Sequence, residues 1–194
     1  MQRGILFAVC AVAMTSGTAS AQAALSANVS IALTSVTGPV GSPTYNYTVT
    51  LHNTGTTQIG TLWYAWLDNP ELDFLPSLPT NVSAPNGWYG LTPGGPGHYS
   101  IEWYNLFGTN IPVGGTQTFT FSSADSPTVL NGQSPAYPAY NTQTSFLYEG
   151  FPEATAGLQF VLPSVAVAAP EPASLSVLGF AGGLLLMRRR RSRN

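Results

Sequence analysis

Alternation between large apolar and polar side chains is the feature that most restricts the fold of this chain. In residues 45–53, Tyr-Asn-Tyr-Thr-Val-Thr-Leu-His-Asn, every second side chain up to Leu51 is large and apolar. Successive side chains of a β-strand point to opposite faces of its sheet, so this period of two predicts a strand with one buried face. Residues 59–67 are apolar at nearly every position and predict a central strand that is covered on both faces.

Six further segments have strand-like patterns, and Pro or Gly separates nearly all of them. They are residues 29–36, 88–91, 98–105, 117–123, 144–149 and 158–167. Between residues 24 and 169 no long run combines helical periodicity with a capping signal, and Pro recurs too often to allow one. Short strands joined by turns predict an all-β fold, a single antiparallel β-sandwich of immunoglobulin-like type with a jelly roll as the rival.

The two ends of the chain differ in composition from the part between them. Residues 1–23 begin with Met-Gln-Arg, continue with an apolar run and end in small residues, which is the pattern of a secretory signal peptide. The single cysteine, Cys10, lies inside this segment. The remaining chain therefore has no disulfide, and its hydrophobic core must stabilise the fold.

A second hydrophobic segment closes the chain. Residues 173–187 are uncharged, and the basic run that follows them consists of Arg188, Arg189, Arg190 and Arg191. As a helix this segment would be about 22 Å long, which is short of the roughly 30 Å of a bilayer core. The arginines predict a stop to transfer on the cytoplasmic side, so we expect a marginal membrane anchor with the preceding residues across the membrane.

Pro170, Glu171 and Pro172 stand immediately before this segment. The order of tripeptide, apolar helix and arginines resembles the PEP-CTERM sorting signal of Gram-negative bacteria. The resemblance implies that an exosortase processes the exported protein at the tripeptide, and that the product reaches the cell surface or extracellular matrix, in connection with exopolysaccharide and biofilm. The expected organisation is a signal peptide in residues 1–23, a sandwich in 24–169 and a sorting signal in 170–194.

Residues 45–55 also resemble the strand and turn of bacterial surface sandwich domains of the CARDB kind.

The charge of the predicted sandwich restricts the partners that it can bind. All six basic residues of the chain lie in the two terminal segments, so residues 24–169 contain acids but neither Lys nor Arg. Phosphate backbones and anionic lipids are bound through Lys and Arg, so this composition excludes nucleic acid as a partner.

Aromatic residues are the first candidates for a binding site. Trp88 and Tyr89 lie in the loop of residues 85–90, Pro-Asn-Gly-Trp-Tyr-Gly, which is the best candidate for exposed rings that contact a glycan. Regular alternation would place the rings of Trp63 and Trp66 on opposite faces of one strand, and packing in the core is the competing role for all of these rings.

Acidic residues are the second candidates. Asp68, Glu71 and Asp73 gather in one segment and could bind Ca²⁺ through oxygen atoms, although the segment lacks the ligand spacing of a dedicated calcium loop. Glu102 and Glu149 lie in predicted strands and could form the acid pair of a glycosidase, but we expect Glu102 to face solvent with an ordinary pKa. No cofactor is expected.

These patterns favour a non-catalytic, exported β-sandwich with a structural or adhesive role at the cell surface. Its expected partners are the export machinery and exosortase, the membrane before processing, and exopolysaccharide. A carbohydrate-binding module of the same architecture is the alternative. A secreted hydrolase is a second alternative, for which the sequence supplies no nucleophile motif.

Overall fold

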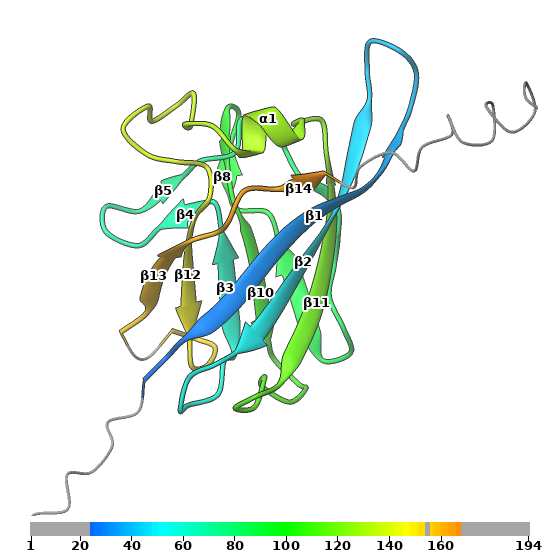
Figure 1. Ribbon diagram of the computed structural model, residues 1–194. Coiled ribbons are helices and arrows are strands. Elements are labelled where there is room, and N and C mark those ends of the chain that lie inside the picture. The colour runs from blue at the N-terminus through cyan, green and yellow to red at the C-terminus, as the bar shows by residue number, and fades with distance from the viewer. Residues whose placement is uncertain (1–23, 154–155, 168–194) are drawn as a thin grey trace, which may run out of the picture.

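The computed structural model describes residues 24–153 and 156–167, and they form a sandwich of two five-stranded sheets (Figure 1). One sheet, here called the β2 sheet, has the order β14 (Ala166–Val167), β1 (Ala27–Thr37), β2 (Thr44–Asn53), β11 (Thr116–Ser123) and β6 (Thr80–Ser83). The other, the β3 sheet, has the order β13 (Leu158–Val161), β12 (Thr144–Tyr148), β3 (Thr61–Tyr64), β10 (Ile101–Asn105) and β7 (Trp88–Leu91). The prediction of an antiparallel β-sandwich is confirmed.

Smaller elements lie at the end of the sandwich that is uppermost in Figure 1. They are the hairpin of β4 (Trp66–Leu67) and β5 (Leu72–Asp73), the hairpin of β8 (Gly94–Gly95) and β9 (His98–Tyr99), and the short helix α1 (Pro127–Leu130). None of the helices in the described ranges is long and apolar enough to cross a membrane. The predicted signal peptide, the tripeptide at 170–172 and the arginines at 188–191 lie outside the described residues.

The strand order agrees with the immunoglobulin-like prediction. In constant-type immunoglobulin domains one sheet has the order A-B-E-D and the other contains C, F and G. Here β1, β2, β11 and β6 follow the first order, and β3, β12 and β13 follow the second. β7 and β10 are additional: they come between β6 and β11 in the chain and extend the β3 sheet beyond β3.

The inward faces of the two sheets form one hydrophobic core. Tyr47, Val49 and Leu51 of β2 are at most 1% exposed, which confirms the face predicted from their spacing. Trp103 of β10 is fully buried and stacks on Phe119 of β11, with 5.2 Å between the ring centroids. Such an aromatic pair stabilises the fold by about 0.5–1.5 kcal/mol beyond the area that it buries.

β3 is covered on both faces, as its apolar composition predicted. Leu62 and Tyr64 point into the core and are fully buried, whereas Trp63 points outward and is still only 9% exposed. Ala65 then takes a left-handed conformation with φ of 59°. This breaks the alternation, so Trp66 lies on the same face as Trp63 and stacks on it at 4.3 Å, contrary to the expectation of opposite faces.

Four strand assignments differ from the prediction. Residues 59–67 divide at Ala65 into β3 and β4, and residues 98–105 divide at Ser100 into β9 and β10. The segment 158–167 contributes to both sheets, since β13 pairs with β12 whereas β14 pairs with β1 in parallel. β6 was not predicted, because its four residues are too few to show a period.

Candidate functional site

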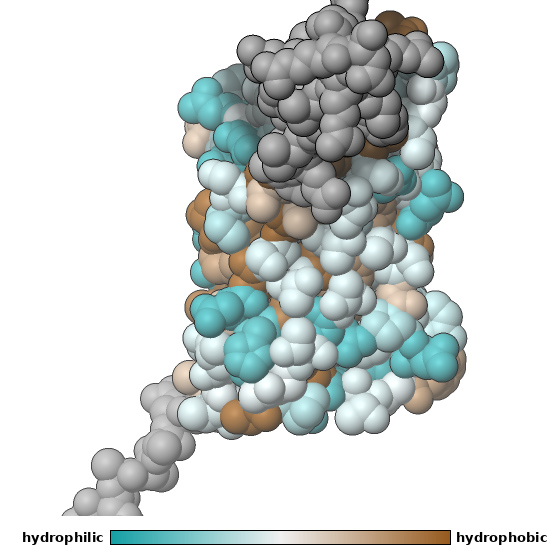
Figure 2. Space-filling model, turned by 45° about the vertical axis from the view of Figure 1, so that its right-hand side comes forward, coloured by the Kyte–Doolittle hydropathy of each residue, from teal (hydrophilic) through white to brown (hydrophobic). Residues whose placement is uncertain are grey.

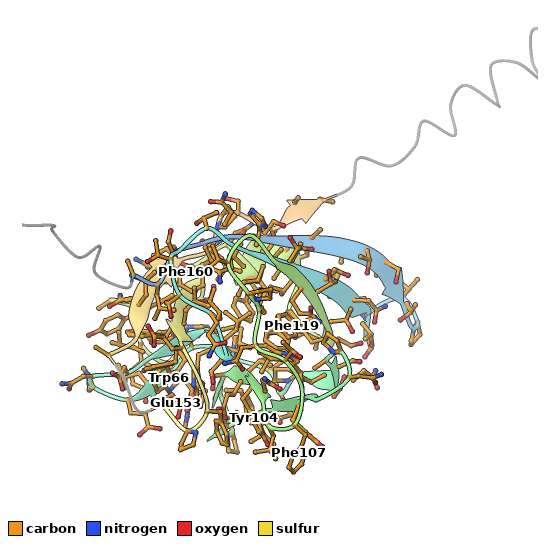
Figure 3. The ribbon with its side chains drawn as sticks, turned by 90° about the horizontal axis from the view of Figure 1, so that it is seen from below. Trp66, Tyr104, Phe107, Phe119, Glu153 and Phe160 are labelled. Carbon is orange, nitrogen blue, oxygen red and sulfur yellow. The ribbon has the colours of Figure 1, made fainter. Side chains whose placement is uncertain are left out.

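Three exposed aromatic rings and the half-buried ring of Tyr104 form a group, here called the aromatic patch, on the outer side of the β3 sheet. Tyr89 and Tyr104 face each other across β7 and β10, with 5.8 Å between near-parallel rings. Phe151 stacks on Tyr104 at 4.1 Å, and Phe107 meets Tyr89 edge-on at 6.1 Å. Phe107 is 79% exposed and Tyr89 44%. In Figure 3, Tyr104 and Phe107 lie at the side of the molecule away from β1, whereas Phe119 lies inside.

Two loops hold Phe107 in place. The backbone N–H groups of Leu106 and Phe107 donate to the carbonyl of Gly87, at 3.1 and 3.3 Å. Gly87 has φ of 85°, and a Cβ there would lie 2.3 Å from the Cα of Gly108, so the close approach of the two loops requires glycine. The predicted glycan-binding loop 85–90 thus acts in part as a support for Phe107.

A chain of amide groups connects the Phe107 loop with the segment that carries Phe151. The Asn105 side chain accepts from Gly108 N–H at 2.7 Å and donates to the Asn110 side chain at 2.5 Å. Asn110 in turn donates to the carbonyl of Glu149 at 3.0 Å. The two phenylalanines of the patch are therefore positioned by one hydrogen-bond network.

Trp88 occupies a different place from the one predicted. Its side chain is 6% exposed, packs edge-on against Phe119 and donates from Nε1 to the carbonyl of Thr109 at 3.2 Å. β7 begins at Trp88, so alternation sends this ring into the core and Tyr89 outward. Of the two predicted contact residues, only Tyr89 presents its ring at the surface.

The neighbouring part of the same outer face is buried. We call it the covered cluster; its members are Trp63, Trp66, Phe146 and Tyr148, which are between 3% and 9% exposed. Trp66 meets Phe146 edge-on at 5.5 Å, in addition to its stacking on Trp63. The sequence gives these rings no feature that distinguishes them from those of the aromatic patch.

Residues 149–153, here called the strap, connect the covered cluster with the aromatic patch. The hydroxyl of Thr61 donates to the carbonyl of Gly150 at 2.8 Å. The indole N–H of Trp63 donates to Glu153 Oε1 at 3.1 Å. Phe151, in the middle of the strap, belongs to the aromatic patch.

Glu102 lies beneath this arrangement, so the prediction that it faces solvent is wrong. Its side chain points to the outer face of the β3 sheet, but it is only 4% exposed, and Oε1 is buried without a hydrogen-bond partner. Burial, and next to it the negative charge and hydrogen bonding of Glu153, raise the pKa of Glu102 to about 8. At neutral pH the Glu102 carboxyl therefore keeps its proton and can donate it to Glu153.

Glu149, the other acid of the candidate pair, follows β12 and is half-buried, and Glu153 is the residue within hydrogen-bonding reach of Glu102. Two carboxyls that share a proton lie closer together than the roughly 5 Å or more that separates the acids of a glycosidase. The contact between Glu102 and Glu153 is thus suited to holding the strap.

The three candidate calcium ligands do not share a common partner in the described residues. Asp68 is exposed and lies within hydrogen-bonding reach of Tyr148, and Asp73 Oδ2 is 4.0 Å from His98 Nδ1. Glu71 is exposed. Among residues 24–153 and 156–167, no group of three or more His, Cys, Asp or Glu side chains could hold a metal ion. The segment therefore does not bring its acids together as a site.

The outer face of the β2 sheet is polar instead of aromatic. Thr48 and Thr50 of β2 lie opposite Thr120 and Thr118 of β11. Figure 2, which turns the right-hand side of Figure 1 forward, shows a surface that is mostly white and teal with smaller brown groups. The two outer faces of the sandwich therefore offer a partner different chemistry.

Comparisons with known proteins show only distant likeness. No protein-family model matches the chain, and no curated protein does. A GH20 exo-β-N-acetylglucosaminidase from Vibrio harveyi, solved in complex with N-acetylglucosamine, is 15% identical with a TM-score of 0.47 over 75% of this chain and 19% of the enzyme. A biomass-sensing module of the Rsgi2 protein of Clostridium thermocellum, which resembles a family 3 carbohydrate-binding module of the cellulosome, is 13% identical with a TM-score of 0.30 over 75% of this chain and 99% of the module. Likeness of this extent assigns neither family nor activity.

Proposed function

We propose that the protein is a non-catalytic β-sandwich that binds neutral polysaccharide outside the cell through the aromatic patch. The observation that carries this proposal is the row of near-parallel rings formed by Tyr89, Tyr104 and Phe151, with Phe107 beside it at 79% exposure. Large apolar rings at the surface cost solvation free energy unless a partner covers them, and a contiguous group of them marks an interaction site. Sugar rings have apolar C–H faces that pack on aromatic rings, while their hydroxyls stay hydrated.

The surroundings of the patch favour a glycan over an apolar partner. Asn86 is exposed beside Gly87, and the amides of Asn105 and Asn110 lie at the base of the Phe107 loop. A few fixed polar groups around aromatic rings are the usual lining of a site that binds a polar ligand by its flat face.

Charge favours a neutral glycan over an anionic one. The described residues include seven Asp and Glu side chains and neither Lys nor Arg, so an anionic polymer would be repelled and would find no counter-charge. Alginate-like and other uronic-acid polymers are therefore expected to bind more weakly than neutral glucans, mannans or chitin.

Binding of this kind suits the exported, adhesive role predicted from the ends of the chain. In this proposal, export removes the signal peptide, an exosortase processes the protein at Pro170, Glu171 and Pro172, and the sandwich then attaches to exopolysaccharide in the matrix. The intact mass of the protein isolated from its host tests the processing, because it reports both ends of the mature chain. A mass that includes residues 173–194 would contradict it.

Co-sedimentation tests the binding. The full-length chain, in mild detergent, is mixed with insoluble neutral polysaccharides and with an anionic polymer gel. We expect retention on at least one neutral polymer and about tenfold weaker retention for Tyr104→Ala, since the central ring of the row is lost. Equal retention of this variant on every polymer that binds the wild type would contradict the role of the patch.

A further inference from the structure

The strap is attached to the sheet by two kinds of contact that respond differently to pH. Near its start, Thr61 donates to Gly150, and Asn110 donates to the carbonyl of Glu149; both contacts join neutral groups. Near its end, Glu153 accepts from Trp63 and meets the carboxyl of Glu102. Only the second attachment contains a group with a pKa near neutrality, the carboxyl of Glu102.

We propose that the strap is a pH-sensitive cover of the β3 sheet, held closed by the proton that Glu102 shares with Glu153 and released when that proton is lost. Geometry supports it: Glu102 is 4% exposed, its Oε1 has no partner, and it lies opposite Trp63, whose indole N–H donates to Glu153 of the strap. When Glu102 loses its proton, two negative charges adjoin, and one of them is on a carboxyl that water barely reaches. Separation of the strap from β10 relieves this repulsion and hydrates both groups.

Neighbouring groups reinforce the repulsion. The titratable groups near this site are Glu153 on the strap, Tyr148 on β12 and Asp68, which follows β4, and the negative charges of Asp68 and Glu153 both raise the pKa of Tyr148. Tyr148 therefore stays neutral where Glu102 ionises. No Lys or Arg occurs in the described ranges to neutralise a second carboxylate. Because the pKa of Glu102 is raised to about 8, we expect the strap to be released just above neutral pH.

Release of the strap changes both regions that it connects. The indole N–H of Trp63 loses its acceptor, and the stacked pair of Trp63 and Trp66 gains contact with water. Phe151 leaves Tyr104, so the aromatic patch loses one ring of its row. If the patch binds glycan as proposed above, retention on polysaccharide falls as the strap opens; this last step rests on the proposed function, and the opening itself does not.

Near-ultraviolet circular dichroism and tryptophan fluorescence test the opening without any glycan. The full-length chain is titrated from pH 6 to 9.5, and far-ultraviolet dichroism confirms that the sheets stay folded. We expect one transition near pH 8 in the wild type and none in Glu102→Gln, whose amide cannot ionise and still donates to Glu153. A flat wild-type signal, or the same transition in both proteins, would overturn the proposal.

Glu153→Gln provides a second variant if the first does not fold. It removes the negative neighbour, so the pKa of Glu102 is expected to fall and the transition to move to lower pH with a smaller amplitude. An unchanged midpoint and amplitude would contradict the shared proton.

Retention on the neutral polymer at pH 6 and 9.5 separates this proposal from the proposed function. We expect a severalfold decrease at the higher pH for the wild type and constant retention for Glu102→Gln. A spectroscopic transition without retention at any pH supports the strap and contradicts glycan binding. Retention without a transition contradicts the strap alone.

Discussion

The covered cluster and the aromatic patch lie side by side on one face of one sheet, are equally rich in aromatic rings, and differ in what covers them. Trp63 is 9% exposed because Trp66 and the strap lie on it, whereas Tyr89 and Phe107, two strands away, are 44% and 79% exposed. An outward ring therefore belongs to the core or to the surface according to whether a second layer reaches it. Substitutions in the covered cluster should therefore change mainly stability, and substitutions in the aromatic patch mainly binding.

The largest effect is expected in the covered cluster. Trp63→Ala removes an indole that is 91% buried, together with its hydrogen bond to Glu153, and should lower the free energy of unfolding by about 3–5 kcal/mol. Urea denaturation at pH 6 measures this change. A loss below about 1 kcal/mol would show that the cluster is not packed as described.

The second largest effect is expected in the pH dependence of stability, which Glu102 should cause. Its folded-state pKa, about 8, lies above its ordinary value of 4.5, so the folded state binds this proton more tightly than the unfolded chain does. The stabilisation is complete below about pH 4.5 and is lost as pH rises toward 8, by on the order of 1–3 kcal/mol. Glu102→Gln should remove this contribution to the slope, as urea denaturation at pH 5 and 8 can show. An identical slope in both proteins would contradict the raised pKa.

Phe107→Ala should have the opposite profile to Trp63→Ala. The ring is 79% exposed, so the free energy of unfolding should change by less than about 0.5 kcal/mol, while retention on the neutral polymer falls about tenfold. Urea denaturation and co-sedimentation are measured on the same sample. A large loss of stability with retained binding would reverse the roles assigned to the two regions.

The smallest expected effect is at the rim of the patch. Leu91 lies on β7 opposite Glu102, and Leu78 lies between β5 and β6; both side chains are 48% exposed. Leu91→Ala should weaken retention two- to threefold, since it removes apolar area beside the rings, by roughly 0.5 kcal/mol. Leu78→Ala, matched in residue type and exposure, should not change retention. Equal effects would indicate non-specific hydrophobic adsorption.

Prediction from the sequence succeeded where one local pattern decides the outcome. Period-two spacing identified the buried face of β2, and the all-apolar run identified β3 as covered on both sides. It failed at Ala65, because alanine carries no preference for a positive φ that would announce the break and return Trp66 to the face of Trp63.

The candidate site was harder to predict, because it depends on contacts between distant parts of the chain. Tyr104 follows the buried Trp103 and could have been identified from alternation as an outward ring, as could the opposite faces of Trp88 and Tyr89. Phe151 reaches Tyr104 from a loop far along the chain, and no local spacing encodes that contact. The burial of Glu102 has the same cause, since the strand pattern places it outward and Glu153 reaches it from the strap.

Affinity electrophoresis of the double variant Tyr89→Ala and Phe107→Ala tests the central claim most directly. Wild type, double variant and Leu78→Ala migrate in gels with and without the neutral polysaccharide that retains the wild type, and urea denaturation confirms that all three are folded. We expect the polymer to slow the wild type and Leu78→Ala equally and to leave the double variant unaffected. Equal slowing of all three would contradict the assignment of binding to the aromatic patch.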